Sequence, residues 1–190
     1  MERTRQPTVG IIEIICGPMF SGKTEELIKR LTRSKIAKKN TVVFKPIIDK
    51  RFDEIQVVSH SDQKIVSIPV KDTDAIKSYL QNTEKPIEVI GIDEAQFFDN
   101  SIVQFVEQLA NSGLRVVLSG LDQDFEGKPF GPMPLLLAAA DVVTKQYAIC
   151  IICGAPASKS HRVNLDIDNN QILVGGMEIY EARCRACLQF

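Results

Sequence analysis

The sequence predicts an α/β fold in which helices flank a mainly parallel sheet and a small metal-binding ribbon follows at the C-terminus. Three observations lead to this prediction. A short apolar segment near the start runs into a glycine-rich loop and then a helical pattern, and further apolar segments alternate with helical patterns along the chain. Four of the five cysteines form two close pairs near the end. Alternating strands and helices are typical of a parallel sheet.

Four short segments have the composition of strands that are covered on both faces of a sheet. They are almost continuously apolar and rich in β-branched residues, as expected for buried parallel strands. They comprise residues 9–16, 41–44, 87–92 and 114–118. We therefore expect four central strands, each followed by a helix or a loop.

Helical periodicity marks two of the connections. From Thr24 to about Asn40, an apolar stripe of leucine and isoleucine alternates with basic residues, and residues 102–109 carry a second apolar face that ends before Gly113. Residues 46–63 are polar and weakly periodic, which predicts a long functional loop. After Gly120, clustered prolines and glycines exclude regular structure as far as residues 135–140.

Residues 17–24, GPMFSGKT, fit the pattern G-x-x-x-x-G-K-[ST] between a predicted strand and a predicted helix. The glycines let the backbone curl so that successive N–H groups can point at phosphate oxygens. Lys23 is then expected to reach the β- and γ-phosphates, and the Thr24 hydroxyl to bind magnesium. The alternative, a simple glycine turn, would leave Lys23 and Thr24 without a role. The pattern predicts a P-loop NTPase-like domain whose phosphate loop comprises Gly17, Pro18, Met19, Phe20, Ser21, Gly22, Lys23 and Thr24.

An acidic pair, Asp93 and Glu94, directly follows the predicted strand 87–92. The carboxyl ends of strands in α/β sheets face the ligand crevice, so Asp93 suits a contact with magnesium. Glu94 can accept a proton from an attacking hydroxyl group or water, which makes it the candidate general base. A solvated turn is the alternative. These residues leave open whether water or an alcohol attacks, and therefore whether the chain is a hydrolase or a kinase.

The cysteine spacing predicts a structural zinc site. The pairs Cys150-x-x-Cys153 and Cys184-x-x-Cys187 can supply four thiolates to one tetrahedral ion, which leaves no open position for catalysis. The insert between the pairs is longer than is usual in such ribbons, so we expect a functional loop there. Cys16 is interpreted as an ordinary packing residue. Loss of the metal is expected to disorder the segment after Cys150. It should therefore abolish binding of the molecule that accepts the phosphate before it affects the phosphate loop.

Composition and charge narrow the class of protein. A content of 44% hydrophobic and 25% charged residues is ordinary for a globular chain and argues against disorder. The net charge of -1 gives no overall electrostatic reason to bind nucleic acid. No apolar stretch approaches the roughly 20 residues that span a bilayer, and residues 1–7 lack a signal-peptide centre. We expect a cytoplasmic protein with no nucleic-acid or membrane partner.

Several motifs together carry a family resemblance. Beside the phosphate loop and the cysteine pairs they are DKR at 49–51, SHSD at 59–62, DEAQFF at 93–98, GLDQDF at 120–125, KPFG at 128–131 and GGMEIY at 175–180. Over nearly its whole length the chain resembles the type II thymidine kinases, which join a P-loop domain to a zinc ribbon. The resemblance implies a flexible lead at residues 1–8, a nucleotide-binding domain at 9–147 and a zinc-ribbon and lasso domain at 148–190.

The resemblance also implies a reaction and the residues that perform it. The γ-phosphate of ATP would pass to the 5'-hydroxyl of thymidine, and also of deoxyuridine, with Glu94, Lys23 and Arg51 as catalytic residues. It further implies a homotetramer. The nucleotide surroundings would include Asp49, Lys50, Arg51, Asp93, Glu94, Ala95 and Gln96.

A lasso loop between the cysteine pairs would close over the base. In this chain the loop corresponds to Gln171, Ile172, Leu173, Val174 and Gly175, together with Tyr180. Phe125 would pack against the pyrimidine. The family commonly has threonine near the start of the lasso, whereas this chain has Ser160, whose hydroxyl is expected to hold the base.

Two other functions are compatible with some of these features. A zinc-ribbon P-loop ATPase that acts on nucleic acid would share the Asp-Glu pair, although the neutral charge and small size weigh against it. A regulatory binding protein would not need Lys23, Thr24, Asp93 and Glu94 together. A dependence of ATP turnover on thymidine or on DNA separates the kinase from the ATPase.

Overall fold

A parallel sheet forms the centre of the molecule. The chain is seen in a computed structural model that describes residues 10–47, 56–58, 64–163 and 179–188. Within them the main sheet has six strands in the order β5-β2-β6-β7-β1-β8, and each neighbouring pair is parallel. The strands are β1 (Ile11–Cys16), β2 (Thr41–Pro46), β5 (Ile68–Val70), β6 (Val89–Ile92), β7 (Arg115–Gly120) and β8 (Val142–Lys145). The predicted α/β class with a mainly parallel sheet is confirmed.

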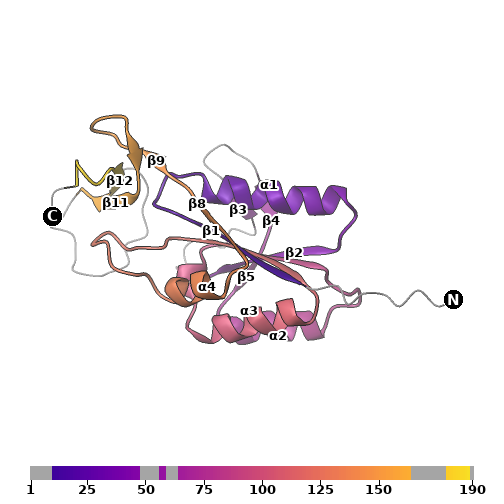
Figure 1. The fold of residues 1–190 in the computed structure, drawn as a ribbon. Coiled ribbons are helices and arrows are strands. Elements are labelled where there is room, and N and C mark those ends of the chain that lie inside the picture. The colour runs from indigo at the N-terminus through magenta and orange to yellow at the C-terminus, as the bar shows by residue number, and fades with distance from the viewer. Residues whose placement is uncertain (1–9, 48–55, 59–63, 164–178, 189–190) are drawn as a thin grey trace.

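Helices cover both faces of this sheet (Figure 1). One face carries α1 (Lys23–Ile36), and the other carries α2 (Thr73–Gln81), α3 (Ser101–Asn111) and α4 (Met133–Ala139). A short 3-10 turn, η1 (Ala95–Phe97), follows β6. Among the described residues, no helix is both long enough and apolar enough to cross a membrane.

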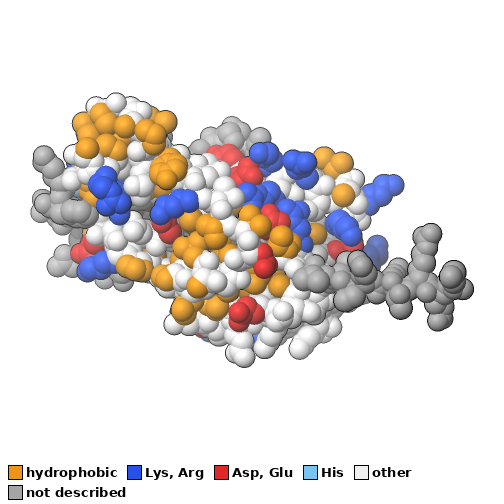
Figure 2. Space-filling model, viewed as in Figure 1, with side chains coloured by type: hydrophobic (Ala, Val, Ile, Leu, Met, Phe, Trp, Pro, Cys, Tyr) orange, Lys and Arg blue, Asp and Glu red, His pale blue; other side chains and the backbone are white. Residues whose placement is uncertain are grey.

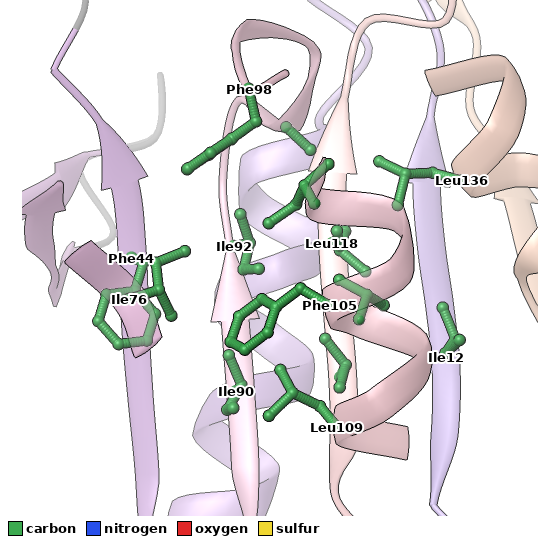
Figure 3. Packing of buried hydrophobic residues seen from close by; sticks show 14 of the residues in the cluster. Ile12, Phe44, Ile76, Ile90, Ile92, Phe98, Phe105, Leu109, Leu118 and Leu136 are labelled. Carbon is green, nitrogen blue, oxygen red and sulfur yellow. The ribbon is translucent and has the colours of Figure 1, made fainter. Parts of the chain in front are cut away.

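The core follows from the alternation of side chains along each strand. On β1, Ile12 and Ile14 join the cluster under α3, whereas Ile15 joins the cluster under α1. Figure 3 shows the first of these clusters, with strand side chains on the same side of the sheet as Phe105 and Leu109 of α3. Both faces are therefore apolar, which explains why the strands read as continuous hydrophobic runs.

Short antiparallel pairs complete the described structure. The pair β3 (Gln56–Val58) and β4 (Lys64–Val66) is a separate two-stranded sheet, although Ile65 packs into the cluster beneath α1. At one end of the molecule, β9 (Ala148–Ile149) pairs with β10 (Pro156–Ala157), and β11 (Lys159–Arg162) with β12 (Tyr180–Arg183). We call these last four strands, with the four paired cysteines, the cysteine module (Figure 1).

The predicted elements exist, but their ends differ. Helix α1 ends at Ile36 rather than near Asn40, because Lys38 adopts a left-handed backbone with a φ of 60°. The amide of Lys38 then donates to Lys35 O, and that of Lys39 to Ser34 O, which is the Schellman arrangement of a helix end. A lysine takes the place usually filled by glycine, so the sequence offered no stop signal there.

Several elements escaped the sequence analysis. Residues 46–63 were predicted to be a loop, and this was wrong for β3, which pairs with β4. The strands β5 and β8 and the helix α2 were not anticipated. Helix α2 does have a local signal, because Asp72 caps it by accepting a hydrogen bond from the Ala75 amide at 2.9 Å. The strands β5 and β8 have only three and four residues, which is too short for a pattern to mark them.

Replacing Leu31 with alanine tests the packing of α1. Leu31 is fully buried in the cluster beneath this helix, so Leu31→Ala should lower the free energy of unfolding by about 2–5 kcal/mol. Ile36 lies on the same helix and is 77% exposed, so Ile36→Ala should change stability by less than about 0.5 kcal/mol. Urea unfolding followed by circular dichroism measures both. Equal losses would contradict this account of the core.

Candidate active site

The loop after β1 has the backbone of a phosphate cradle. Gly17 has a φ of 141°, and a side chain on it would run into the carbonyl oxygen of Gln146. Phe20 and Gly22 also have positive φ, at 63° and 80°, and Gly22 caps the start of α1. These left-handed turns curl the chain between the strand and the helix N-terminus, as an anion cradle requires.

Lys23 lies inside this loop. Its Nζ donates a hydrogen bond to Pro18 O at 2.7 Å, and the Ser21 hydroxyl donates to the same oxygen at 2.8 Å. Burial lowers the pKa of Lys23, while nearby carboxylates, first that of Glu94, oppose this shift. The lysine and the predicted base therefore lie close enough to interact electrostatically.

Asp93 and Thr24 meet where β6 ends beside α1. The Thr24 hydroxyl donates to Asp93 Oδ2 at 3.4 Å, and the buried Ser119 at the end of β7 donates to Asp93 Oδ1. Burial, and next the charge of Glu94, raise the pKa of Asp93 to about 7. A hydroxyl and a carboxylate oxygen are hard donors that suit Mg²⁺, and a bound cation would stabilise the ionised carboxylate.

Glu94 adopts a left-handed backbone with a φ of 52°, which is uncommon for a residue with a side chain. It lies at the turn between β6 and η1 and is half-buried. The side-chain amide of Gln96 donates to Glu94 Oε2 at 2.5 Å. Sparsely populated backbone conformations cluster at functional sites, where the surrounding structure holds them.

The loop after β7 borders the cysteine module. The guanidinium carbon of Arg162 lies 5.3 Å from the centroid of the Phe125 ring, within the range of a cation–π contact. Arg162 and Tyr180 are opposite each other in the β11–β12 pair, and both are buried. Phe125 and Tyr180, predicted to contact the acceptor, thus belong to neighbouring segments.

Ser160 lies closer to the phosphate loop than the sequence suggested. Its Oγ accepts a hydrogen bond from the Met19 amide at 3.0 Å, and the side chain is buried. The hydroxyl was predicted to hold the base. The contact with Met19 uses only its acceptor side, so the hydroxyl proton can still be donated to another group.

Two predicted segments fall outside the described residues. They are Asp49 to Arg51, expected near the phosphates, and Gln171 to Gly175, expected over the base. Their roles stay predictions.

The four paired cysteines converge. The sulfur atoms of Cys150, Cys153, Cys184 and Cys187 all lie within 4.8 Å of one another. Sulfurs at about 2.3 Å from a tetrahedral zinc ion are a little under 4 Å apart, so the cluster fits that ion. A backbone hydrogen bond from Cys184 is the main cause that lowers the pKa of Cys150 to about 6, which favours the thiolate that a metal needs.

The phosphate loop packs directly on this module. Phe20 lies against the small core that includes Cys150, Ala157 and Cys184. Together with the hydrogen bond between Met19 and Ser160, this contact joins two consecutive residues of the phosphate loop to the cysteine module. Loss of a metal from the module should therefore also disturb the phosphate loop. This revises the expectation that acceptor binding is affected before the phosphate loop.

Sequence reasoning missed several polar residues at this edge of the sheet. Ser119 holds Asp93, Lys145 pairs with Asp122 at 2.6 Å, and the Lys159 ammonium donates to Gln123 at 2.6 Å. Ser119, Asp122 and Gln123 all stand at or just after the end of β7. The argument that selected Asp93 after its strand could have found them, because parallel strands end at the same edge.

The fold and the residues at this edge of the sheet define the class of protein. A parallel sheet, a left-handed glycine loop with lysine and threonine after β1, and an acidic pair after β6 are those of a P-loop nucleotide-binding protein. The family model for thymidine kinase matches residues 10–188. The chain is 51% identical over 178 residues to a thymidine kinase of Bdellovibrio bacteriovorus, a match that covers 94% of this chain and 85% of that relative. The chain belongs to the thymidine kinase family, which confirms the resemblance drawn from its motifs.

Removing the metal tests the contact between the two parts of the site. A zinc chelator, added with excess Mg²⁺, should weaken binding of a non-hydrolysable ATP analogue by about 5- to 150-fold, the usual range of coupling between sites. Released metal is measured by a colorimetric dye and binding by calorimetry, both without acceptor. Full affinity for the analogue in metal-free, folded protein would show that the phosphate loop does not depend on the cysteine module.

Proposed function

We propose that this chain transfers the γ-phosphate of ATP to the 5'-hydroxyl of thymidine, and of deoxyuridine, to give the nucleoside 5'-monophosphate. The observation that carries the proposal is that Lys23 of the phosphate loop and the Asp93–Glu94 pair meet at one edge of the sheet. Membership in the thymidine kinase family makes phosphoryl transfer the reaction of this site.

The donor would bind along the phosphate loop. Its anionic oxygens would face the N–H groups after Gly17 and the N-terminus of α1, and Lys23 would exchange Pro18 O for the β- and γ-phosphates. Thr24 and Asp93 would hold Mg²⁺, which supplies charge neutralisation at the β- and γ-oxygens. The oxygen atoms of the Thr24 hydroxyl and the Asp93 carboxylate are ligands of the kind that Mg²⁺ prefers, which supports this cation.

A cleft beside the loop suits the nucleoside part of the donor. It has a volume of about 630 Å³ and extends from Gly22 along α1 to Gln146. The Gln146 Oε1 atom is buried and lacks a hydrogen-bond partner among the described residues. The side-chain amide of Gln146 can therefore pair with a base that presents both a donor and an acceptor, as adenine does. This supports a nucleoside triphosphate, such as ATP, as the phosphoryl donor.

In the proposed reaction the 5'-hydroxyl oxygen attacks the γ-phosphorus in line with the departing ADP. A bond forms between that oxygen and phosphorus, the bond to the β–γ bridging oxygen breaks, and the hydroxyl proton passes to Glu94. Lys23 stabilises the transferred group, and Arg51 is proposed to do the same. The base would lie against Phe125 and Tyr180, with the Ser160 hydroxyl and the backbone of residues 171–175 around it.

We further propose that the enzyme is a cytoplasmic homotetramer. Strand β8 is an edge of the sheet, and its Val142 and Val143 are exposed. Hydrophobic side chains also gather at the outer end of the cysteine module, where Ile149, Ile151 and Ile152 are exposed (Figure 2). An open sheet edge with exposed apolar residues is a feature that proteins commonly cover by association.

The substitution Glu94→Gln tests the general base. It keeps the shape of the side chain but cannot accept the proton, so kcat should fall about 10²- to 10⁴-fold while affinity for an ATP analogue stays within about threefold. Glu107 is exposed on α3, and Glu107→Gln serves as the matched control with unchanged turnover. Release of ADP in the presence of thymidine is measured. Normal turnover in the Glu94 variant would refute the assignment.

An acceptor screen separates the proposed kinase from an ATPase that acts on nucleic acid. ADP should form with thymidine and deoxyuridine, and a phosphorylated nucleoside should appear in equal amount. Single- and double-stranded DNA should leave the background rate unchanged, in keeping with the net charge of -1. ATP turnover that DNA stimulates and thymidine does not would favour the alternative.

A further inference from the structure

Gln96 stands two residues after the proposed base and is only 2% exposed. Its side-chain nitrogen Nε2 donates to Glu94 Oε2 at 2.5 Å, and its Oε1 accepts from the Leu121 amide at 3.0 Å. A buried amide is stable when its polar atoms are hydrogen-bonded, and here both ends are. The side chain therefore links the carboxylate of Glu94 to the backbone that follows β7.

Room for this link depends on two glycines. A β-carbon on Gly120 would lie 2.7 Å from Gln96 Oε1, and one on Gly131 would run into the Gln96 carbonyl oxygen. The rings of Phe97 and Phe130 meet edge to face with centroids 5.5 Å apart, which holds η1 against the segment that carries Gly131. Gln96 is thus closely surrounded, at its side chain by Gly120 and at its backbone by Gly131.

Glu94 needs such support, because a half-buried carboxylate on a left-handed residue has several rotamers open to it. An amide donor at one carboxylate oxygen selects one orientation and leaves the other oxygen available to an acceptor hydroxyl. The same Gln96 side chain fixes the start of the loop that continues to Asp122 and Phe125. The Gln96 side chain therefore contacts both the proposed general base, Glu94, and the loop whose Phe125 is proposed to contact the nucleoside.

We infer that Gln96 is a positioning residue that holds the Glu94 carboxylate in its reactive orientation and couples it to the Gly120–Leu121 backbone. The inference rests on the proposed function, in which Glu94 is the general base. It assigns Gln96 to the base rather than to the nucleotide surroundings that the family resemblance implied. Glutamine suits this role, since asparagine is one methylene shorter and glutamate lacks the N–H donor.

The test compares Gln96→Ala and Gln96→Glu, each in the native background and combined with Glu94→Gln. In the native background kcat should fall about 10- to 100-fold, because misplacing a reactive group has effects of this size. The KM values for ATP and thymidine should stay within about threefold. In the Glu94→Gln background, Gln96→Ala should change kcat by less than about twofold, since the carboxylate it positions is gone.

Two controls keep the outcomes distinct. Gln104 is exposed on α3, and Gln104→Ala should leave all kinetic constants unchanged. Gln96→Glu preserves the shape of the side chain, and circular dichroism reports whether either variant is folded. If Glu94→Gln alone keeps full turnover, the proposed base is wrong and the inference falls with it.

If Glu94→Gln is inactive, the double variants decide about Gln96 itself. A further loss of kcat from Gln96→Ala in that background would overturn the positioning role and indicate a structural one. A raised KM for ATP with unchanged kcat would likewise overturn it and return Gln96 to the nucleotide site. Non-additive losses confined to kcat would support it.

Discussion

The parallel pairing of β6, β7 and β1 is the constraint on which the site depends. Cys16 is opposite Gly120, and Ile92 is opposite Leu118, so the three strands end within two residues of one another at the same edge. The phosphate loop follows β1, the acidic pair follows β6, and Ser119 is the second-last residue of β7. Close packing on both faces holds this register, because a slip by one residue would exchange the faces toward which each strand's side chains point and put a side chain where Gly91 now meets Leu31.

That edge concentrates features that do not favour folding by themselves. Asp93 is buried and Lys23 is half-buried, and the loss of water around each group shifts its pKa in the direction that favours its neutral form. Phe20 and Glu94 have left-handed backbones. The proposed donor, a triphosphate with a divalent cation, would supply the opposite charges and so stabilise this arrangement when it binds. The large apolar clusters on both sides of the sheet stabilise the fold around it.

The cysteine module is part of this arrangement rather than an appendage. Phe20 contributes to its small core, and Ser160 accepts the amide hydrogen of Met19. A module of this size buries little apolar surface, and a metal held by its four thiolates would supply much of its stability. A metal ion bound there would therefore also support one wall of the phosphate loop.

The sequence alone determined the features that depend on neighbouring residues: the strand, loop and helix around residues 17–24, the acid pair after a buried strand, and the spacing of the cysteines. Their chemistry is local, so a short pattern carries it. Only the tertiary structure decided the contacts between distant residues, such as Met19 with Ser160 and Gln96 with Leu121. It also decided that β8 forms the edge of the sheet and that α1 ends at Ile36. These depend on how the whole chain packs, because a hydrogen bond between residues far apart leaves no periodic signal in either segment.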